Sequence, residues 1–185
     1  NGVHTMGSIG TTMYVGGAFT ALAGQTRNRL GVFDMSTGAL LAWNPNVTAT
    51  GATVNTMAFE VPVLEPSEDR VFFGGFFTGV GGQARNNLAA VNADTGVPTG
   101  WNPNANGTVR AMRLRYQIGS RFMAAAYLGG NFTSVAGQAR NRLAEVTSAS
   151  VATAWNPSAN SDVHALAWIG STIFEYLGVD HRRRD

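Results

Sequence analysis

A block of three short motifs recurs along the chain, and this repetition limits the possible folds more than any other feature of the sequence. Each block contains Gly-Gly-x-Phe-Thr, then Arg-Asn-x-Leu, then Trp-Asn-Pro. The motifs begin at Gly16, Arg27 and Trp43, at Gly74, Arg85 and Trp101, and at Gly129, Arg140 and Trp155. Gly16 and Gly74 are 58 residues apart, and Gly74 and Gly129 are 55 residues apart. A fixed period of this length is typical of stacked or radial arrays of one supersecondary unit.

Each period contains four short segments with the pattern of a β-strand. The first segment alternates apolar and polar residues, as in Val54-Asn55-Thr56-Met57. A second apolar run leads into the glycine pair, a third follows the Arg-Asn pair, and a fourth ends at the tryptophan. Such runs predict strands, and no segment has the period of an amphipathic helix. We therefore expect an all-β chain of four-stranded antiparallel blades of a β-propeller. The expected units cover about 1–52, 53–105 and 106–159, with a partial fourth unit at 160–185.

The composition is that of a folded chain and excludes several classes of function. Of the 185 residues, 44% are hydrophobic and 13% are charged, which is enough apolar surface to fold. The chain has no cysteine, so disulfides and thiolate chemistry are excluded. The net charge is only +2, and three basic residues stand together at Arg182, Arg183 and Arg184. This distribution argues against a nucleic-acid surface, and no apolar run is long enough to predict a membrane span.

The repeated pattern resembles a bacterial β-propeller repeat family of unknown function. Gly-Gly-x-Phe-Thr, Gly-Gln-x-Arg-Asn-x-Leu, a turn such as Ser36-Thr37-Gly38, and Trp-Asn-Pro carry the resemblance, which covers essentially the whole chain. It implies a propeller within a secreted, multi-domain surface protein. The turn and the tryptophan are also similar, more weakly, to the blades of quinoprotein propellers. The third copy departs from the pattern, because Thr147-Ser148-Ala149-Ser150 replaces the glycine turn.

The number of units is too small for a closed ring. A closed propeller has about four to eight blades, and an open arc leaves strand edges unpaired. We expect either the remaining blades of the same polypeptide or a homo-oligomer to close the ring, and we favour a fragment of a larger protein. The tail at 180–185 also departs from the repeat. Our hypothesis is that a shifted reading frame replaces the expected fourth Gly-Gly-x-Phe-Thr motif there.

Two sets of repeated side chains are candidates for ligand binding. Arginines at one equivalent position are able to bind carboxylates or sulfated sugars through two hydrogen bonds, and tryptophans at another are able to stack on sugars. These candidates are Arg27, Arg85, Arg140, Trp43, Trp101 and Trp155. The alternative, which we favour, is structural: the arginines hold loop carbonyls and the tryptophans join neighbouring blades. Three identical copies fit that alternative better, because a binding site usually breaks the symmetry of a repeat.

No other pattern in the sequence predicts chemistry. The three histidines lack the spacing of metal ligands, and the acidic residues form no recurring pair for acid–base catalysis. We therefore expect no catalytic residues, no metal and no cofactor in this segment. The first hypothesis is a non-catalytic extracellular or cell-surface module that binds protein or glycan. The alternative is the propeller portion of an enzyme, such as a quinoprotein-like oxidoreductase or a polysaccharide-active protein, with its catalytic residues outside this segment.

Overall fold

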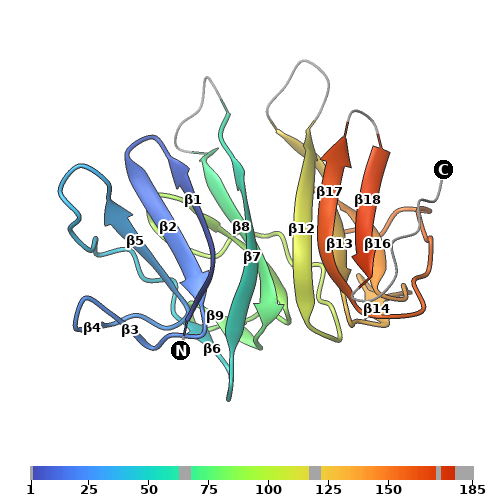
Figure 1. The fold of residues 1–185 in the computed structure, drawn as a ribbon, viewed down its shortest axis with the longest axis horizontal. Coiled ribbons are helices and arrows are strands. Elements are labelled where there is room, and N and C mark those ends of the chain that lie inside the picture. The colour runs from blue at the N-terminus through green and yellow to red at the C-terminus, as the bar shows by residue number, and fades with distance from the viewer. Residues whose placement is uncertain (1, 63–67, 117–121, 170–171, 178–185) are drawn as a thin grey trace.

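The computed structural model describes residues 2–62, 68–116, 122–169 and 172–177, and in them the chain is built from small antiparallel sheets (Figure 1). The described part contains no α-helix. The expected tail at 180–185 lies outside the described residues. The prediction of an all-β chain is therefore confirmed.

Three sheets of three strands repeat the same order, in which the second strand lies between the first and the third. They are β1 (Val3–Ile9), β2 (Thr12–Gly17) and β5 (Leu30–Asp34); β7 (Thr53–Glu60), β8 (Arg70–Phe76) and β11 (Leu88–Asn92); and β12 (Val109–Tyr116), β13 (Met123–Gly130) and β16 (Leu143–Thr147). A two-stranded sheet of β17 (Val163–Ile169) and β18 (Thr172–Leu177) follows them. The first strand of each unit pairs with the second through a register shift at its start.

The expected fourth strand is reduced to one bridge in each unit. The bridging pairs are Phe33 with Leu40, Val91 with Pro98, and Val146 with Ala152. In the second unit the backbone hydrogen bonds that flank this bridge run from Asn92 N to Val97 O and from Thr99 N to Ala90 O, so Pro98 sits at a position that donates no hydrogen bond to the third strand. Beyond the bridge the chain leaves the sheet and carries the tryptophan toward the next unit. The prediction of four-stranded units is therefore corrected to three strands and a bridge.

Short strands form hairpins at one end of the sheets, and some of them also pair with the neighbouring unit. They are β3 (Ala21–Leu22), β4 (Gln25–Thr26), β6 (Val47–Thr48), β9 (Gly79–Val80), β10 (Gln83–Ala84), β14 (Ser134–Val135) and β15 (Gln138–Ala139). The first unit contributes β6, which pairs with β9 of the second unit. Ala105 of the second unit forms the equivalent bridge to Val135 of the third.

The hydrophobic core lies between the sheets rather than inside any one of them. One buried cluster joins residues of the first and second units, and another joins the second and third. A smaller cluster joins the third unit to Val163 and Leu166 of β17. The first strands are neighbours in space, because β7 contacts both β1 and β12, and β12 also contacts β17 (Figure 1). Each unit therefore completes its core against the next.

The first glycine of each pair makes this close packing possible. A Cβ atom at Gly16 would lie 2.7 Å from Cγ1 of Val54, and one at Gly74 would lie 2.6 Å from Cγ1 of Val109. Gly129 has the same relation to Val163, also at 2.6 Å. Glycine is found in strands where another backbone approaches closely. The valine that begins each following unit occupies the space that a side chain would take.

In the first unit, no other described unit covers the same face. Val54, Val109 and Val163 are fully buried, whereas the equivalent Val3 is 47% exposed. Met6 is 65% exposed, although its counterparts Met57, Met112 and Leu166 are all buried. The face of β1 that carries Val3 and Met6 is called the β1 face below.

We expect Gly74→Ala to destabilise the fold by about 1–3 kcal/mol, because the added methyl group overpacks a site filled by Val109. Gly100→Ala is the matched control, because a Cβ atom there meets nothing within 4 Å. Urea unfolding of both variants measures the difference. Equal stabilities of the two variants would contradict the close-packing role of the glycine.

Candidate functional site

The three repeated arginines bind backbone carbonyls within their own units. The Nη2 groups of Arg27, Arg85 and Arg140 donate to Leu41 O, Thr99 O and Thr153 O at 2.8, 2.9 and 2.5 Å. Each Nη1 group donates to the carbonyl of the preceding residue. The guanidinium groups thus hold the segment before the tryptophan against the hairpin before the third strand. These donors are already engaged, which leaves little of each guanidinium for a ligand.

The repeated tryptophans lie at the junctions between units. Trp43 and Trp101 are 7% and 4% exposed. Their Nε1 groups donate to Asn92 O and Thr147 O of the following unit, at 3.4 and 3.1 Å. Each ring also packs edge to face on an aromatic residue of its own unit: Trp43 on Tyr14, Trp101 on Phe72 and Trp155 on Tyr127. A buried indole with its N–H satisfied joins two units and leaves no broad face for a sugar.

The turn after the third strand, which accepts the tryptophan hydrogen bond in the second and third units, is stabilised by one side chain in each unit. Oδ1 of Asp34 accepts hydrogen bonds from Ser36 and Thr37, which holds the pKa of Asp34 at about 2. Asn92 makes the equivalent contacts to Asp94 and Thr95 in the second unit. In the third unit, Thr147 Oγ1 accepts from Val151 N, so the turn forms there without a glycine.

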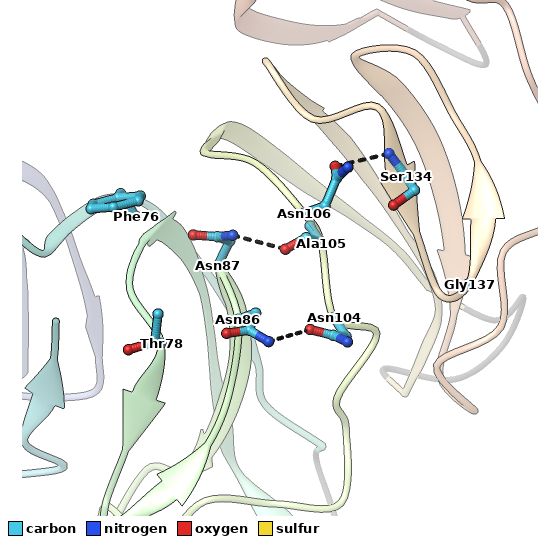
Figure 2. Close-up of a pocket in the computed structure, with 9 residues that line it drawn as sticks. All are labelled: Phe76, Thr78, Asn86, Asn87, Asn104, Ala105, Asn106, Ser134 and Gly137. Carbon is cyan, nitrogen blue, oxygen red and sulfur yellow. Dashed lines mark hydrogen bonds between the residues drawn. The ribbon is translucent and has the colours of Figure 1, made fainter.

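A polar groove opens at the junction between the second and third units (Figure 2). It has a volume of about 410 Å³, within the range of about 300–1,000 Å³ for small-molecule sites. We call it the junction groove, and it is lined by Phe76, Thr78, Asn86, Asn87, Asn104, Ala105, Asn106, Ser134 and Gly137. Phe76 and Thr78 lie on the second-unit side, with Ser134 on the third-unit side. None of the described residues that line it is charged.

The groove lies where the second unit departs from the other two. In the Arg-Asn-x-Leu motif, the variable position is Arg29 in the first unit, Arg142 in the third and Asn87 in the second. All three have a positive φ, of 68°, 65° and 64°. Arg142 donates to Ala159 O, and Asn87 donates to the equivalent Ala105 O at 2.8 Å. Asn87 therefore keeps the junction contact with a shorter side chain and leaves space that an arginine would occupy.

A second departure places an aromatic ring beside this space. The variable residue of Gly-Gly-x-Phe-Thr is Phe76 in the second unit, and it is Ala18 in the first and Asn131 in the third. Phe76 is 42% exposed at the end of β8. An exposed aromatic ring at a concave polar site is a common feature of ligand recognition.

Hydrogen bonds fix the amide groups of the groove. Asn86 Nδ2 donates to Asn104 Oδ1 at 2.7 Å. Oδ1 of Asn106 accepts from the backbone N–H groups of Thr133 and Ser134, both at 2.9 Å. In the described part of the chain, Asn86 Oδ1 and Asn104 Nδ2 make no hydrogen bond and remain for a ligand. The groove therefore offers at least one acceptor and one donor whose positions are already held (Figure 2).

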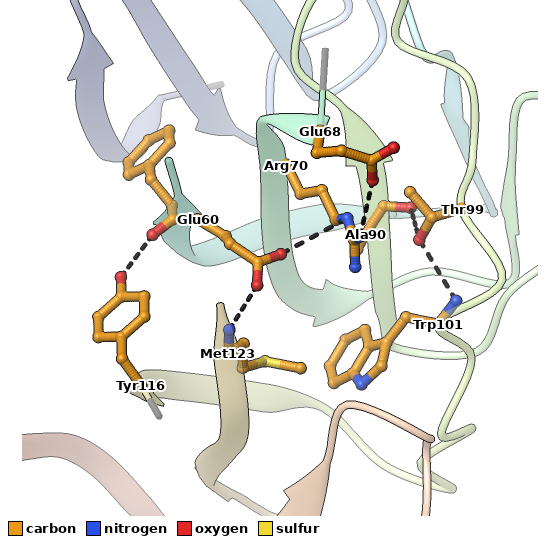
Figure 3. Close-up of polar contacts among 9 residues, drawn as sticks. Glu60, Glu68, Arg70, Ala90, Thr99, Trp101, Tyr116 and Met123 are labelled. Atoms are coloured by element: carbon orange, nitrogen blue, oxygen red, sulfur yellow. Dashed lines mark hydrogen bonds and ion pairs between the residues drawn. The ribbon is translucent and has the colours of Figure 1, made fainter. Parts of the chain in front are cut away.

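A polar cluster at the other end of the sheets connects the same two units (Figure 3). Glu60 lies at the end of β7 and is buried, with one oxygen 3.5 Å from Nε of Arg70. Its other oxygen accepts a hydrogen bond from the backbone N–H of Met123 in β13. Tyr116 Oη donates to Phe59 O at 2.5 Å. These contacts join sheet to sheet and are structural.

A further buried carboxylate lies in the third unit. Glu145 accepts hydrogen bonds from Arg115 Nη2 and Thr153 Oγ1, both at 2.7 Å. Burial alone raises the pKa of Glu145, but the hydrogen bonds from Arg115, Thr153 and Tyr127 outweigh it, and the net shift is downward. The equivalent positions are Val32 and Ala90. Both oxygens of the Glu145 carboxylate therefore already accept hydrogen bonds from residues of the same unit.

The described residues show no group of three or more His, Cys, Asp or Glu side chains that could hold a metal ion. No helix among them is long and apolar enough to cross a membrane. No protein-family model, curated protein or solved structure matches the chain. The resemblance to a propeller repeat family therefore stays a prediction.

The candidates from the sequence and the groove are different residues. The structure does not bring the six repeated arginines and tryptophans into one site, because each set is spread over separate units. The groove residues Phe76 and Asn87 were not predicted from the sequence, because the candidates there are the residues that all three copies share. The available signal was that Asn87 replaces an arginine of both other copies, and that Phe76 is aromatic where the other copies have alanine and asparagine.

We expect Glu145 to make the fold less stable in acid. A carboxyl group whose pKa is lowered in the folded state stabilises the fold above its unfolded pKa, near 4.5, and that contribution is lost as the pH falls through the folded value. Thermal unfolding between pH 7 and pH 3 measures the loss, and Glu145→Gln is expected to show a smaller one. The same acid dependence in both proteins would contradict this role.

Proposed function

We propose that the chain is an arc of a β-propeller that serves as a non-catalytic binding module. Equivalent sheets follow one another with their first strands adjacent, which is the arrangement of blades around an axis. Trp43 and Trp101 each bind a backbone carbonyl at the turn of the next unit. In this proposal the repeated residues build the scaffold and the departures from the repeat carry the function.

The β1 face supports the propeller assignment. Val3 and Met6 occupy the same positions as residues that pack between units elsewhere in the chain. Every described counterpart of these two residues is buried against a preceding unit. An exposed apolar face of this kind marks an interaction surface. The proposal assigns it to another unit of the same repeat, supplied by the same polypeptide or by a homo-oligomer.

The junction groove is the proposed binding site. The observation that carries this proposal is that two residues found only in the second unit, Asn87 in place of an arginine and the exposed Phe76, line one junction. The ligand class is protein or glycan, as expected for a module on the cell surface or outside the cell. The functional assignment rests on the groove and on the repeat, since fold by itself does not specify function.

Asn87→Arg is the test of this site, because it converts the second unit to the residue found at Arg29 and Arg142. The backbone at all three positions has a positive φ, so the variant is expected to fold. We expect wild type to bind members of an array that carries neutral, uronic and sulfated oligosaccharides and extended peptides, and the variant to lose that binding.

Asn44→Arg is the matched control, because it adds the same charge at an exposed position outside the groove lining. It is expected to bind as wild type does. Equal binding by wild type and Asn87→Arg, or an array without any binding, would contradict the proposed site.

A further inference from the structure

We propose that the junction groove binds an uncharged oligosaccharide, with the apolar face of one sugar ring on Phe76 and hydroxyl groups of the sugar chain on Asn86 and Asn104. This inference rests on the proposed function and specifies the chemistry of its ligand. It commits to a neutral saccharide, and an extended peptide is the alternative that the test distinguishes.

The apolar part of the argument is Phe76. Its ring is 42% exposed although neighbouring residues of β8, Val71 to Gly75, are fully or nearly fully buried. The C–H groups of one face of a pyranose form an apolar surface, and covering both that surface and the ring removes apolar area from water. Ala18 and Asn131 provide no such ring at the other two junctions.

The polar part of the argument is the pair of amides. The hydrogen bond between Asn86 and Asn104 orients both side chains and leaves an outward acceptor on Asn86 and an outward donor on Asn104. A sugar hydroxyl both donates and accepts, so one hydroxyl of the ligand is able to donate to Asn86 Oδ1 and another to accept from Asn104 Nδ2. Because the amides are held before binding, little side-chain entropy is lost when the ligand arrives.

The absence of charge among the described lining residues selects against an ionic ligand. A carboxylate, sulfate or phosphate that enters the groove loses hydration and finds no arginine or lysine in the lining to compensate for it. Arg29 and Arg142 provide that charge at the first and third junctions, and the second junction has Asn87 instead. The groove is therefore suited to neutral rather than acidic sugars.

The test is an NMR titration of the full chain with a panel of neutral disaccharides, each paired with its uronic acid or sulfated analogue. We expect at least one neutral sugar to shift the side-chain amide signals of Asn86 and Asn104 in a saturable way. The acidic analogue is expected to bind about tenfold more weakly or not at all.

Phe76→Ala and Phe76→Trp separate stacking from a general effect on folding. Phe76 lies on the surface, so both variants are expected to keep the wild-type melting temperature. Phe76→Ala is expected to weaken sugar binding about tenfold, and Phe76→Trp to retain it. Equal affinity of Phe76→Ala and wild type would overturn the stacking role.

The outcomes also separate this inference from the proposed function. If no neutral saccharide in the panel binds, and wild type but not Asn87→Arg binds an extended peptide, the sugar inference fails while the binding site stands. If acidic analogues bind as tightly as neutral ones, the inference also fails. If neither sugar nor peptide distinguishes wild type from Asn87→Arg, both proposals fail together.

Discussion

The contact between a glycine of one unit and a valine of the next is the constraint on which the rest of the structure depends. At Gly74 there is no room for a Cβ atom, because Val109 fills the space. The buried clusters lie between sheets, so a single unit has no core of its own. A chain built in this way gains stability by adding neighbours, as repeat proteins do. It also exposes an apolar face wherever a neighbour is lacking, as Val3 and Met6 show.

Much of the fold followed from the period and the strand patterns, since both are local in sequence. The first three strands of each unit lie where alternation and the glycine pairs predicted them. The fourth was wrong because an apolar run that approaches a tryptophan looks like a strand, although it forms only one bridge to the third strand and residues such as Val97 and Val151 are exposed. The pairing of β6 with β9 was not predicted either. Two-residue strands have no periodicity, and their partners are distant in the sequence.

The site was harder to predict than the fold, because the residues that distinguish it are not the repeated ones. Repetition directs attention to Arg27, Trp43 and their counterparts, whose contacts hold carbonyls and junctions. Function in a symmetric array is expected where symmetry is broken: Asn87 replaces an arginine that both other copies have, and Phe76 is the aromatic residue at a position that differs in all three copies. The groove beside Phe76 depends on the absence of an arginine at position 87, where the other two copies have Arg29 and Arg142. Only the structure shows that both line one space between two units.

The most direct test of the account adds one more unit ahead of β1. Joining a second copy of residues 54–108, with Met57→Leu in that copy, directly to Val3 supplies the neighbour that the β1 face lacks. Hydrogen peroxide oxidation followed by mass spectrometry then reports the exposure of each methionine. The account predicts that Met6, 65% exposed in the present chain, becomes as protected as Met112, while Met35, 50% exposed, still reacts. Oxidation of Met6 at the same rate with and without the added unit would contradict the account.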